Sequence, residues 1–359
     1  MNLPSWRVKL NLSKKPNKAG AFPAVEFSLT NSELSALRSV WLKHAGSRSD
    51  ISRLLGLSRP TASVLVKKLM DTKYLTEDGC CRSSGGKPAI QLRINPDRFH
   101  TIGIDIGYEN TVRALRLDAA GEIAASIEIT ATSGYSDRLK AVVDAVQTLR
   151  TPECCGVGIA VSGTVDPFRS MIITSANFEL TGKPLASEAS AAVGLPIYID
   201  NRARMAARAE MFSGAAKGVS DFLLVSLGKG VGSALCFSDR IYCGVSGRAG
   251  ELRDILVPGY SGGMTTLEKA LSEDTLEQQD YPCKKMAAIC AGGFRQVLSI
   301  TAQNVLILAG RFALFPESFR EELQKNMPDT DLRFSCFGKD SGTRGSAIAA
   351  AGYTIFDQL

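Results

Sequence analysis

The stretch SDISRLLGLSRPTASVLVKKLMDTKYL, residues 49–75, decides the fold of the N-terminal part of the chain. Apolar residues recur at helical spacing on both sides of a Gly-Leu-Ser turn, which predicts two short amphipathic helices. Gly56 can end the first helix in a left-handed conformation, Ser58 can cap the second, and Pro60 is tolerated in its first turn. The residues expected to face the core are Ile51, Leu54, Leu55, Ala62, Leu65, Val66 and Leu69.

The outward face of the second helix carries hydrogen-bond donors suited to phosphate oxygens and base edges. This arrangement is typical of a helix-turn-helix with its recognition helix at about 59–72. The alternative is an ordinary helical hairpin with a solvated basic face. The turn residues and the donor-rich second helix favour DNA binding over that alternative.

The flanking segments complete a winged helix-turn-helix. A first helix is expected from about 32 to 44, capped by Thr30 or Asn31. A strand with alternating Ile90, Leu92 and Ile94 is reached through a glycine-rich, basic turn, which predicts a wing, although a plain β-hairpin fits the same pattern. The candidate DNA-binding residues are Ser58, Arg59, Thr61, Ser63, Lys67, Lys68, Arg82 and Lys87.

Charge is unevenly distributed along the 359 residues. Residues 1–95 hold 16 Lys and Arg against 6 Asp and Glu, a net charge of +10 in a chain whose total is +6, which leaves −4 on the remainder. A basic module joined to a mildly acidic body indicates that only the first part meets a polyanion. Residues 1–24 read as a flexible basic arm, for which an unstructured tail is the plain alternative to an ordered groove contact.

Cysteine usage and hydropathy indicate a cytoplasmic protein with no membrane segment. The chain has nine cysteines and no Cys-x-x-Cys pair, and two pairs are adjacent in sequence, which suits neither a disulfide nor a zinc finger. We therefore expect the cysteines to be reduced thiols. The first residues lack the apolar core of a signal peptide, and no segment approaches a membrane span.

After Asn95-Pro96 the chain alternates strands and helices, which predicts two α/β lobes. We expect a basic arm at 1–24, a winged helix-turn-helix at 25–96 and a two-lobed domain at 97–359. Lobe one would comprise about 97–199 plus a C-terminal helix at 343–357, and lobe two about 200–342. Strands are expected at 100–107, 112–117, 122–129, 156–161, 197–200, 222–227, 232–237, 305–309 and 332–337, and helices near 136–149, 201–213, 264–272, 284–301, 316–325 and 343–357.

Two glycine turns, DIG at 105–107 and LGKGVG at 227–232, stand at strand ends. Glycine there lets backbone N–H groups approach a phosphate closely. A hairpin turn explains each one equally well. Two such turns, each opening a β-hairpin in its own lobe, indicate a phosphate-binding fold more specifically than either turn alone.

Together these segments resemble the ROK family of repressors, open reading frames and sugar kinases, and within it the xylose and N-acetylglucosamine repressors. The matching motifs are SRPTAS at 58–63, SGGKPA at 84–89, GIDIG at 103–107, GVGIAVSG at 156–163, DN at 200–201, GKGVG at 228–232 and GRAGE at 247–251. The resemblance implies a winged helix-turn-helix followed by an actin/hexokinase-like domain. It also implies homo-oligomers and a sugar site in the interlobe cleft.

The departures from the family argue against catalysis. ROK kinases carry Asn-Asp-Ala-Asn where this chain has NRAR at 201–204, and the family's aspartate is the general base. Arg202 cannot accept a proton, because guanidinium stays protonated. Tyr108 and Glu109 replace small residues of the first phosphate loop, and a carboxylate there repels a phosphate. No catalytic residue and no cofactor is therefore expected.

The resemblance also implies a structural zinc site that this chain has lost. The family's histidine position is occupied by Asp254, and its cysteine stretch has become PGYSGGMTTLE at 258–268. A structural zinc needs four nitrogen or sulfur ligands, so we expect no metal.

Candidate ligand-binding residues are those that match the family's sugar-gripping positions, together with the arginine beside them: Asn201, Arg202, Glu251 and Glu268. The equal alternative is that they are structural hydrogen bonders in a cleft without a ligand. Arg202 and Arg204 suggest a further possibility, bidentate recognition of an acidic or phosphorylated sugar.

The sequence thus predicts a DNA-binding transcriptional regulator, a repressor, with an inactive sugar-kinase-like domain. We expect a homodimer or tetramer on a pseudo-palindromic double-stranded operator, with a sugar or sugar derivative as possible effector. Two alternatives stay open. One is a ROK-type ATP-dependent sugar kinase with an appended module, and the other is a constitutive DNA-binding protein whose two-lobed domain only dimerises.

Overall fold

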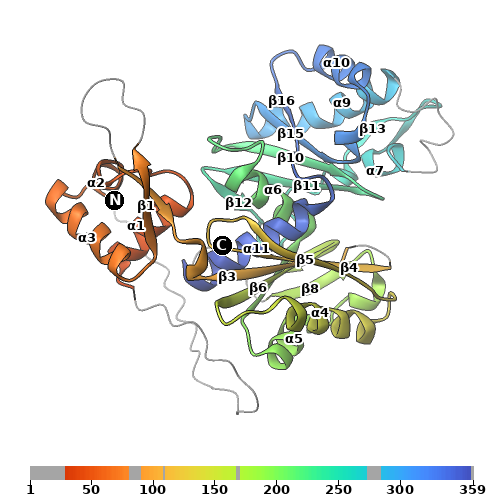
Figure 1. Ribbon diagram of the computed structural model, residues 1–359. Helices are drawn as coiled ribbons and strands as arrows, with labels where there is room; N and C mark the ends of the chain where they lie inside the picture. The colour runs from red at the N-terminus through yellow and green to blue at the C-terminus, as the bar shows by residue number, and fades with distance from the viewer. Residues whose placement is uncertain (1–28, 81–89, 108–109, 167–169, 273–283, 357–359) are drawn as a thin grey trace.

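The computed structural model describes residues 29–80, 90–107, 110–166, 170–272 and 284–356. A helical and β-hairpin module at the N-terminal end stands beside two stacked α/β lobes (Figure 1). Among the described residues, no helix combines the length and the apolar character needed to cross a bilayer.

The N-terminal module is a winged helix-turn-helix made of α1 (Asn31–Trp41), α2 (Arg48–Leu55), α3 (Arg59–Asp71), β1 (Leu75–Cys80) and β2 (Ile90–Ile94). Thr30 and Glu33 form a reciprocal capping box at the start of α1, which confirms the predicted cap. β1 and β2 pair in antiparallel fashion, with Leu75 opposite Ile94. The tip of the wing, with Arg82 and Lys87, lies outside the described residues.

Sheet one, in lobe one, has the strand order β5-β4-β3-β6-β9. Strands β3, β4 and β5 are joined antiparallel, and β6 and β9 add parallel to β3. Its strands are β3 (His100–Asp105), β4 (Thr111–Leu117), β5 (Ile123–Thr130), β6 (Cys154–Val161) and β9 (Ile197–Asn201), with α4 (Tyr135–Leu149) and α5 (Leu185–Val193) on one face (Figure 1).

Sheet two, in lobe two, repeats this topology with the order β12-β11-β10-β15-β16. β10 pairs antiparallel with β11 and parallel with β15, as β3 does with β4 and β6. Its elements are β10 (Phe222–Leu227), β11 (Val231–Phe237), β12 (Arg240–Tyr242), β15 (Val305–Gly310), β16 (Asp331–Phe334), α9 (Lys284–Thr301) and α10 (Glu317–Asn326). Both glycine turns therefore open a β-hairpin, one in each lobe, as predicted.

Two helices, α6 (Arg202–Ser213) and α11 (Ser341–Ile355), lie between the lobes and pack against each other. α11 also packs against β3 and β6, and glycines make that approach possible. A Cβ atom at Gly103 would collide with the carbonyl of Thr343, and one at Gly158 with the carbonyl of Ser346. These two motif glycines are therefore required for helix–sheet packing.

Several expectations need correction. Leu54 was expected in the core of the module, but its side chain is 49% exposed. The helix expected at 264–272 is shorter, because β14 (Met264–Thr266) pairs with β13 (Leu256–Pro258) and α7 (Leu267–Ala270) starts only after the cap at Thr266. Elements that the pattern did not predict include α5, the strands β12, β13 and β14, and the hairpin of β7 (Gly163–Asp166) and β8 (Met171–Ser175).

Candidate DNA-binding surface and interlobe cleft

Local signals fix the geometry of the helix-turn-helix. The side chain of Ser47 accepts a hydrogen bond from the backbone N–H of Asp50 and caps α2. α2 ends at Gly56, whose φ of 63° places it in the left-handed region. Ser58 then caps α3 by accepting from the N–H of Thr61 at 3.2 Å. The turn and the start of the recognition helix are therefore held as predicted.

The recognition helix α3 buries one face and exposes the other. Ala62, Val66 and Leu69 are fully buried against the module core. Because these three define the inward direction, the outermost row of the helix is Pro60, Val64, Lys67 and Asp71. All four are exposed, and Val64 is 70% exposed although it is apolar.

The predicted DNA-binding residues on α3 differ in how free their polar groups are. The hydroxyls of Ser58 and Thr61 lie 2.7 Å apart in one hydrogen bond, and the Ser63 hydroxyl donates to the carbonyl of Arg59 at 2.9 Å. These three hydroxyls stay solvent exposed but serve the helix itself. Arg59 and Lys67 are exposed cations on this face.

Lys68 has a partner that was not predicted. Its Nζ lies 2.5 Å from a carboxylate oxygen of Glu33 on α1, whose side chain is only 2% exposed. The hydrogen bond from Lys68 lowers the pKa of Glu33 below its ordinary value. Lys68 therefore joins α3 to α1, but its side chain stays 59% exposed and its contact with a phosphate stays a prediction.

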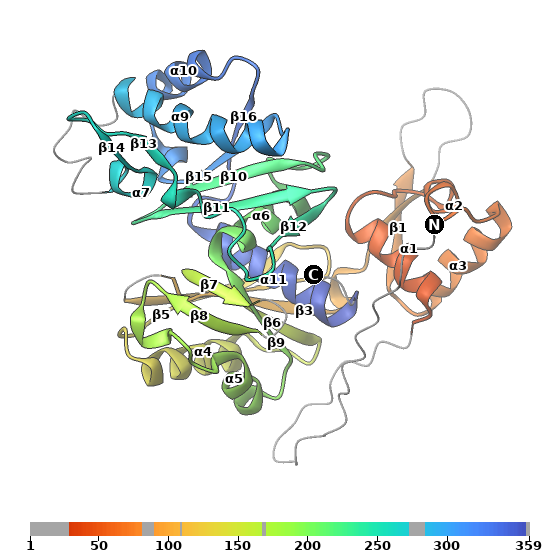
Figure 2. The same ribbon diagram turned by 180° about the vertical axis from the view of Figure 1, so that it is seen from behind.

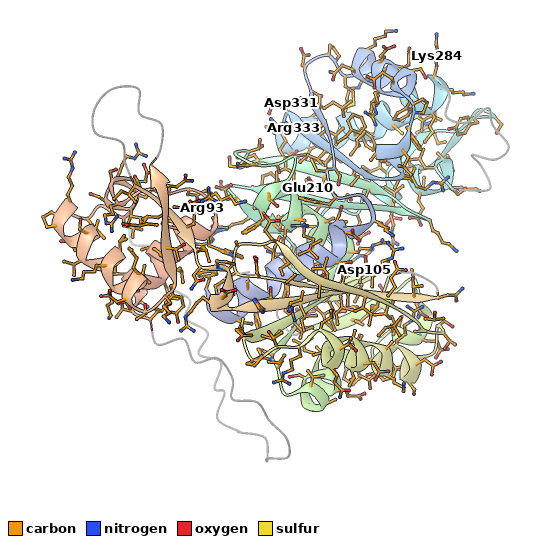
Figure 3. The ribbon with its side chains drawn as sticks, viewed as in Figure 1. Arg93, Asp105, Glu210, Lys284, Asp331 and Arg333 are labelled. Atoms are coloured by element: carbon orange, nitrogen blue, oxygen red, sulfur yellow. The ribbon has the colours of Figure 1, made fainter. Side chains whose placement is uncertain are left out.

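The wing strands carry acidic residues that basic side chains neutralise. Glu77 pairs with Arg48 at 2.7 Å, and Asp78 pairs with Arg93, also at 2.7 Å. Arg93 lies on the wing strand β2 (Figure 3). These pairs reduce the repulsion that two carboxylates on β1 would exert on DNA phosphates.

An ion pair lies at the end of β3, where the two lobes meet. Asp105, at the end of β3, is completely buried and accepts a hydrogen bond from Arg202 Nε at 2.8 Å. Its other oxygen accepts from the backbone N–H of Gly107 at 2.8 Å. Figure 3 shows Asp105 at the level where the two lobes meet. A Cβ atom at Gly107 would lie 2.6 Å from Ser162 Oγ and 3.1 Å from Arg202 Cδ, so the first glycine turn is tightly enclosed.

Arg204 is a buried structural residue. Its Nε donates to Asp200 at 2.6 Å, and its terminal nitrogens donate to the carbonyls of Gly247 at 2.8 Å and Val165 at 3.2 Å. Asp200 also accepts from the hydroxyl of Tyr198 at 3.0 Å. The suggestion that Arg204 recognises an acidic sugar is wrong, because its side chain is 3% exposed and its guanidinium is bound within the protein.

The other candidate ligand residues are engaged to different degrees. The Asn201 amide donates to the Gly163 carbonyl at 2.7 Å and accepts from the N–H of Ala203 at 2.8 Å, so it caps α6. Glu268 accepts from the N–H of Val231 at 3.1 Å and so takes one of the turn donors that a phosphate would use. Glu251 lies 3.3 Å from Arg253 Nε and keeps 24% of its side chain exposed, and Arg202 keeps 30%.

The hairpin β13–β14 stands where the resemblance implies a zinc site. A hydrogen bond between Gly259 N–H and the Gly263 carbonyl, 3.0 Å long, closes it, and Lys285 on α9 contacts the Tyr260 carbonyl. Across the described ranges, no group of three or more His, Cys, Asp or Glu side chains is arranged to hold a metal ion.

The module is joined to the lobes by an aromatic cluster that sequence reasoning missed. The ring of Trp41, at the end of α1, lies 4.9 Å from the ring of Phe212 on α6 and 4.9 Å from that of Phe356 after α11. All three are at least 93% buried. The C-terminal end of α11 is the part of the lobes nearest to the module, while α3 lies on the module's far side (Figures 1 and 2).

Comparisons with known proteins agree with this architecture. The chain is 30% identical over 230 residues to the xylose repressor of Caldicellulosiruptor bescii, covering 61% of this chain and 57% of the relative. It is 30% identical over 170 residues to the glucokinase of Halalkalibacterium halodurans, covering 45% of this chain and 51% of that protein. The chain thus spans little more than half the length of the curated relatives it matches.

A solved structure shows the same fold over nearly the whole chain. A ROK family transcriptional regulator, described as a homologue of the E. coli MLC protein, superposes with a TM-score of 0.70 at 18% identity, covering 91% of this chain and 97% of that one. The sequence model of the ROK family matches residues 101–310, which is more than half of the chain. The chain therefore belongs to the ROK family.

Proposed function

We propose that this protein is a DNA-binding transcriptional regulator, acting as a repressor, in which residues 25–96 bind DNA and residues 97–359 no longer phosphorylate sugars. The observation that carries the proposal is the exposed face of α3, with Arg59 and Lys67, on a winged helix-turn-helix. In both views α3 lies on the side of the module away from the two lobes (Figures 1 and 2). Similarity to xylose repressors supports the same assignment.

Binding as a homodimer would place two copies of α3 in successive major grooves of a pseudo-palindromic operator. Lys67 and Arg59 would contact phosphates or guanine edges, and the wing residues Arg82 and Lys87 would flank the backbone. We place the protein in the cytoplasm, where such an operator is accessible.

The test is selection of genomic fragments by the full-length protein at near-physiological salt. The matched control is the double variant Arg59→Ala/Lys67→Ala, whose two side chains are exposed and whose fold should therefore be intact. We expect an inverted repeat to be enriched by the wild type only. For Lys67→Ala alone, the slope of log affinity against log salt should fall by about 1. Equal recovery of fragments by wild type and control would refute the proposal.

Sign and stoichiometry need their own measurements. A reporter placed downstream of the selected operator should be expressed at a lower level when the wild-type protein is present, and higher expression would show an activator. Light scattering of the complex should give two chains per inverted repeat, with four as the tetrameric alternative.

A sugar-derived effector would bind through Arg202 and Glu251, the two candidate ligand residues described above as partly exposed. A ligand that favours one arrangement of the lobes would shift DNA affinity by population shift. A panel of neutral sugars and sugar acids should raise the melting temperature for at least one member and change operator affinity. If operator affinity is the same with every sugar of the panel, the two-lobed domain serves only for dimerisation.

A sugar kinase is the second candidate, because the glucokinase of H. halodurans matches almost half of the chain. Arg202 stands where the family's kinases carry the general base, and it is paired with Asp105 of the first phosphate loop. A guanidinium cannot deprotonate a sugar hydroxyl. We expect no release of ADP from ATP with glucose, mannose or xylose. Phosphoryl transfer to any of them would restore this candidate.

A further inference from the structure

The outermost row of the recognition helix is partly apolar. Pro60 and Val64 lie one turn apart near the start of α3, and both are exposed, Val64 by 70%. In helix-turn-helix proteins the N-terminal residues of the recognition helix reach the base edges. A partner that binds this surface therefore meets apolar side chains at the centre of the contact.

The polar residues around this row are poorly placed to read bases instead. Ser58 and Thr61 share a hydrogen bond at the cap, and Ser63 donates to the carbonyl of Arg59. Lys68 is held by Glu33 on α1. Lys67 is an exposed cation in the same outer row, and Arg59 is an exposed cation at the first residue of the helix, and phosphate oxygens or guanines can pair with both.

The charge of the surface makes DNA the fitting occupant. The first 95 residues carry a net charge of +10. The helix-turn-helix frame favours DNA over a membrane surface, and the major groove combines phosphates at its walls with one apolar group on its floor. That group is the C5-methyl of thymine.

We propose that Val64 is a specificity-determining residue that contacts a thymine methyl group in the major groove, with Pro60 beside it. This inference rests on the proposed function, since it names what the DNA-binding face recognises. Each half of the operator would carry a thymine opposite Val64. Removal of that methyl should weaken binding about fourfold, the factor expected for one buried methyl group.

The experiment uses the full-length protein and the operator recovered by fragment selection. Each thymine of both half-sites is replaced in turn by deoxyuridine, which pairs in the same way and lacks only the methyl group. We expect a loss of about fourfold per half-site at one position with the wild type. With Val64→Ala, the thymine and uracil operators should bind equally at that position.

Two controls keep the outcome interpretable. Val64→Ala should fold normally because the side chain is exposed and alanine favours helix. Val245→Ala removes a fully exposed valine far along the sequence in lobe two, and should keep the wild-type preference for thymine. If the wild type tolerates uracil everywhere, or if Val64→Ala keeps the penalty, this inference is wrong while the regulator stands. If no operator is recovered at all, the proposed function fails and this inference with it.

Discussion

Substitution of Phe212 by alanine should loosen the N-terminal module from the lobes. The Phe212 ring is 4% exposed and lies 4.9 Å from the ring of Trp41. Deletion of a buried phenylalanine side chain costs about 3–5 kcal/mol, and roughly 0.5–1.5 kcal/mol of that comes from an aromatic pair. Because Phe356 still covers Trp41 in the variant, we expect the low end, about 3 kcal/mol.

The assay follows the environment of Trp41 during urea unfolding. The chain has two tryptophans, so a Trp6→Phe background makes Trp41 the single fluorescent reporter. In that background the Trp41 transition should coincide with the loss of circular dichroism. After Phe212→Ala it should move to lower urea than the main transition, because the module opens before the lobes.

Phe312→Ala is the matched control for this experiment. Phe312 is fully buried, and it packs within the hydrophobic core of lobe two. Its substitution should cost a similar free energy yet leave Trp41 reporting the main transition. If the two variants shift the Trp41 signal equally, the aromatic cluster does not hold the module, and the coupling argued here is refuted.

Three further changes test single contacts. Lys68→Met should destabilise the module by about 1–2 kcal/mol, less than for a fully buried pair because the Lys68 side chain is 59% exposed. The pKa of Glu33 is lowered in the folded state, so the stability difference between wild type and variant should be present above pH 4.5 and fade as the pH falls below it. Thermal melts over this pH range would measure that difference. Burial lowers the pKa of His100, so the folded state favours the neutral imidazole, and the protein loses stability as the pH falls below about 6.5. His100→Gln should therefore flatten the dependence of the melting temperature on pH between about pH 7 and 5. An unchanged slope of melting temperature against pH would contradict this. Gly158→Ala should cost about 1–3 kcal/mol through collision with the carbonyl of Ser346, and a melting temperature equal to wild type would show that α11 can yield.

Local signals were sufficient to predict the helix-turn-helix. Gly56 and Ser58 end one helix and cap the next through contacts within a few residues, so α3 begins where the sequence places it. The alternation of strands and helices likewise predicted both lobes, because each long element carries its own apolar period. Short strands were missed where pairing with a neighbour, as in β13–β14, decides the structure.

Long-range contacts explain the other errors. The ion-pair partner of Lys68 was missed because Glu33 belongs to another helix, and no periodicity links the two. Leu54 lies on the apolar stripe of α2, but the described residues leave 49% of it exposed. The partners of Trp41 come from the ends of α6 and α11, far along the sequence, so a buried face was predictable and its occupants were not.

The ion pair between Asp105 and Arg202 joins the end of β3 to the start of α6. Asp105 is completely buried, so without a cation its carboxylate would be an uncompensated charge. Removal of one partner from a buried pair costs about 3–5 kcal/mol. Arg202→Met should therefore destabilise the protein, toward the low end of that range because its side chain is 30% exposed to water.

The double variant Arg202→Met/Asp105→Asn separates a structural pair from a ligand site. Asparagine keeps an oxygen for the N–H of Gly107, which lies 2.8 Å from the carboxylate, and removes the unpaired charge. The double variant should recover most of the melting temperature and bind the operator as the wild type does. If Arg202→Met alone melts like the wild type, the cleft does not depend on this pair. The role of Arg202 as the cation that balances Asp105 would then be wrong.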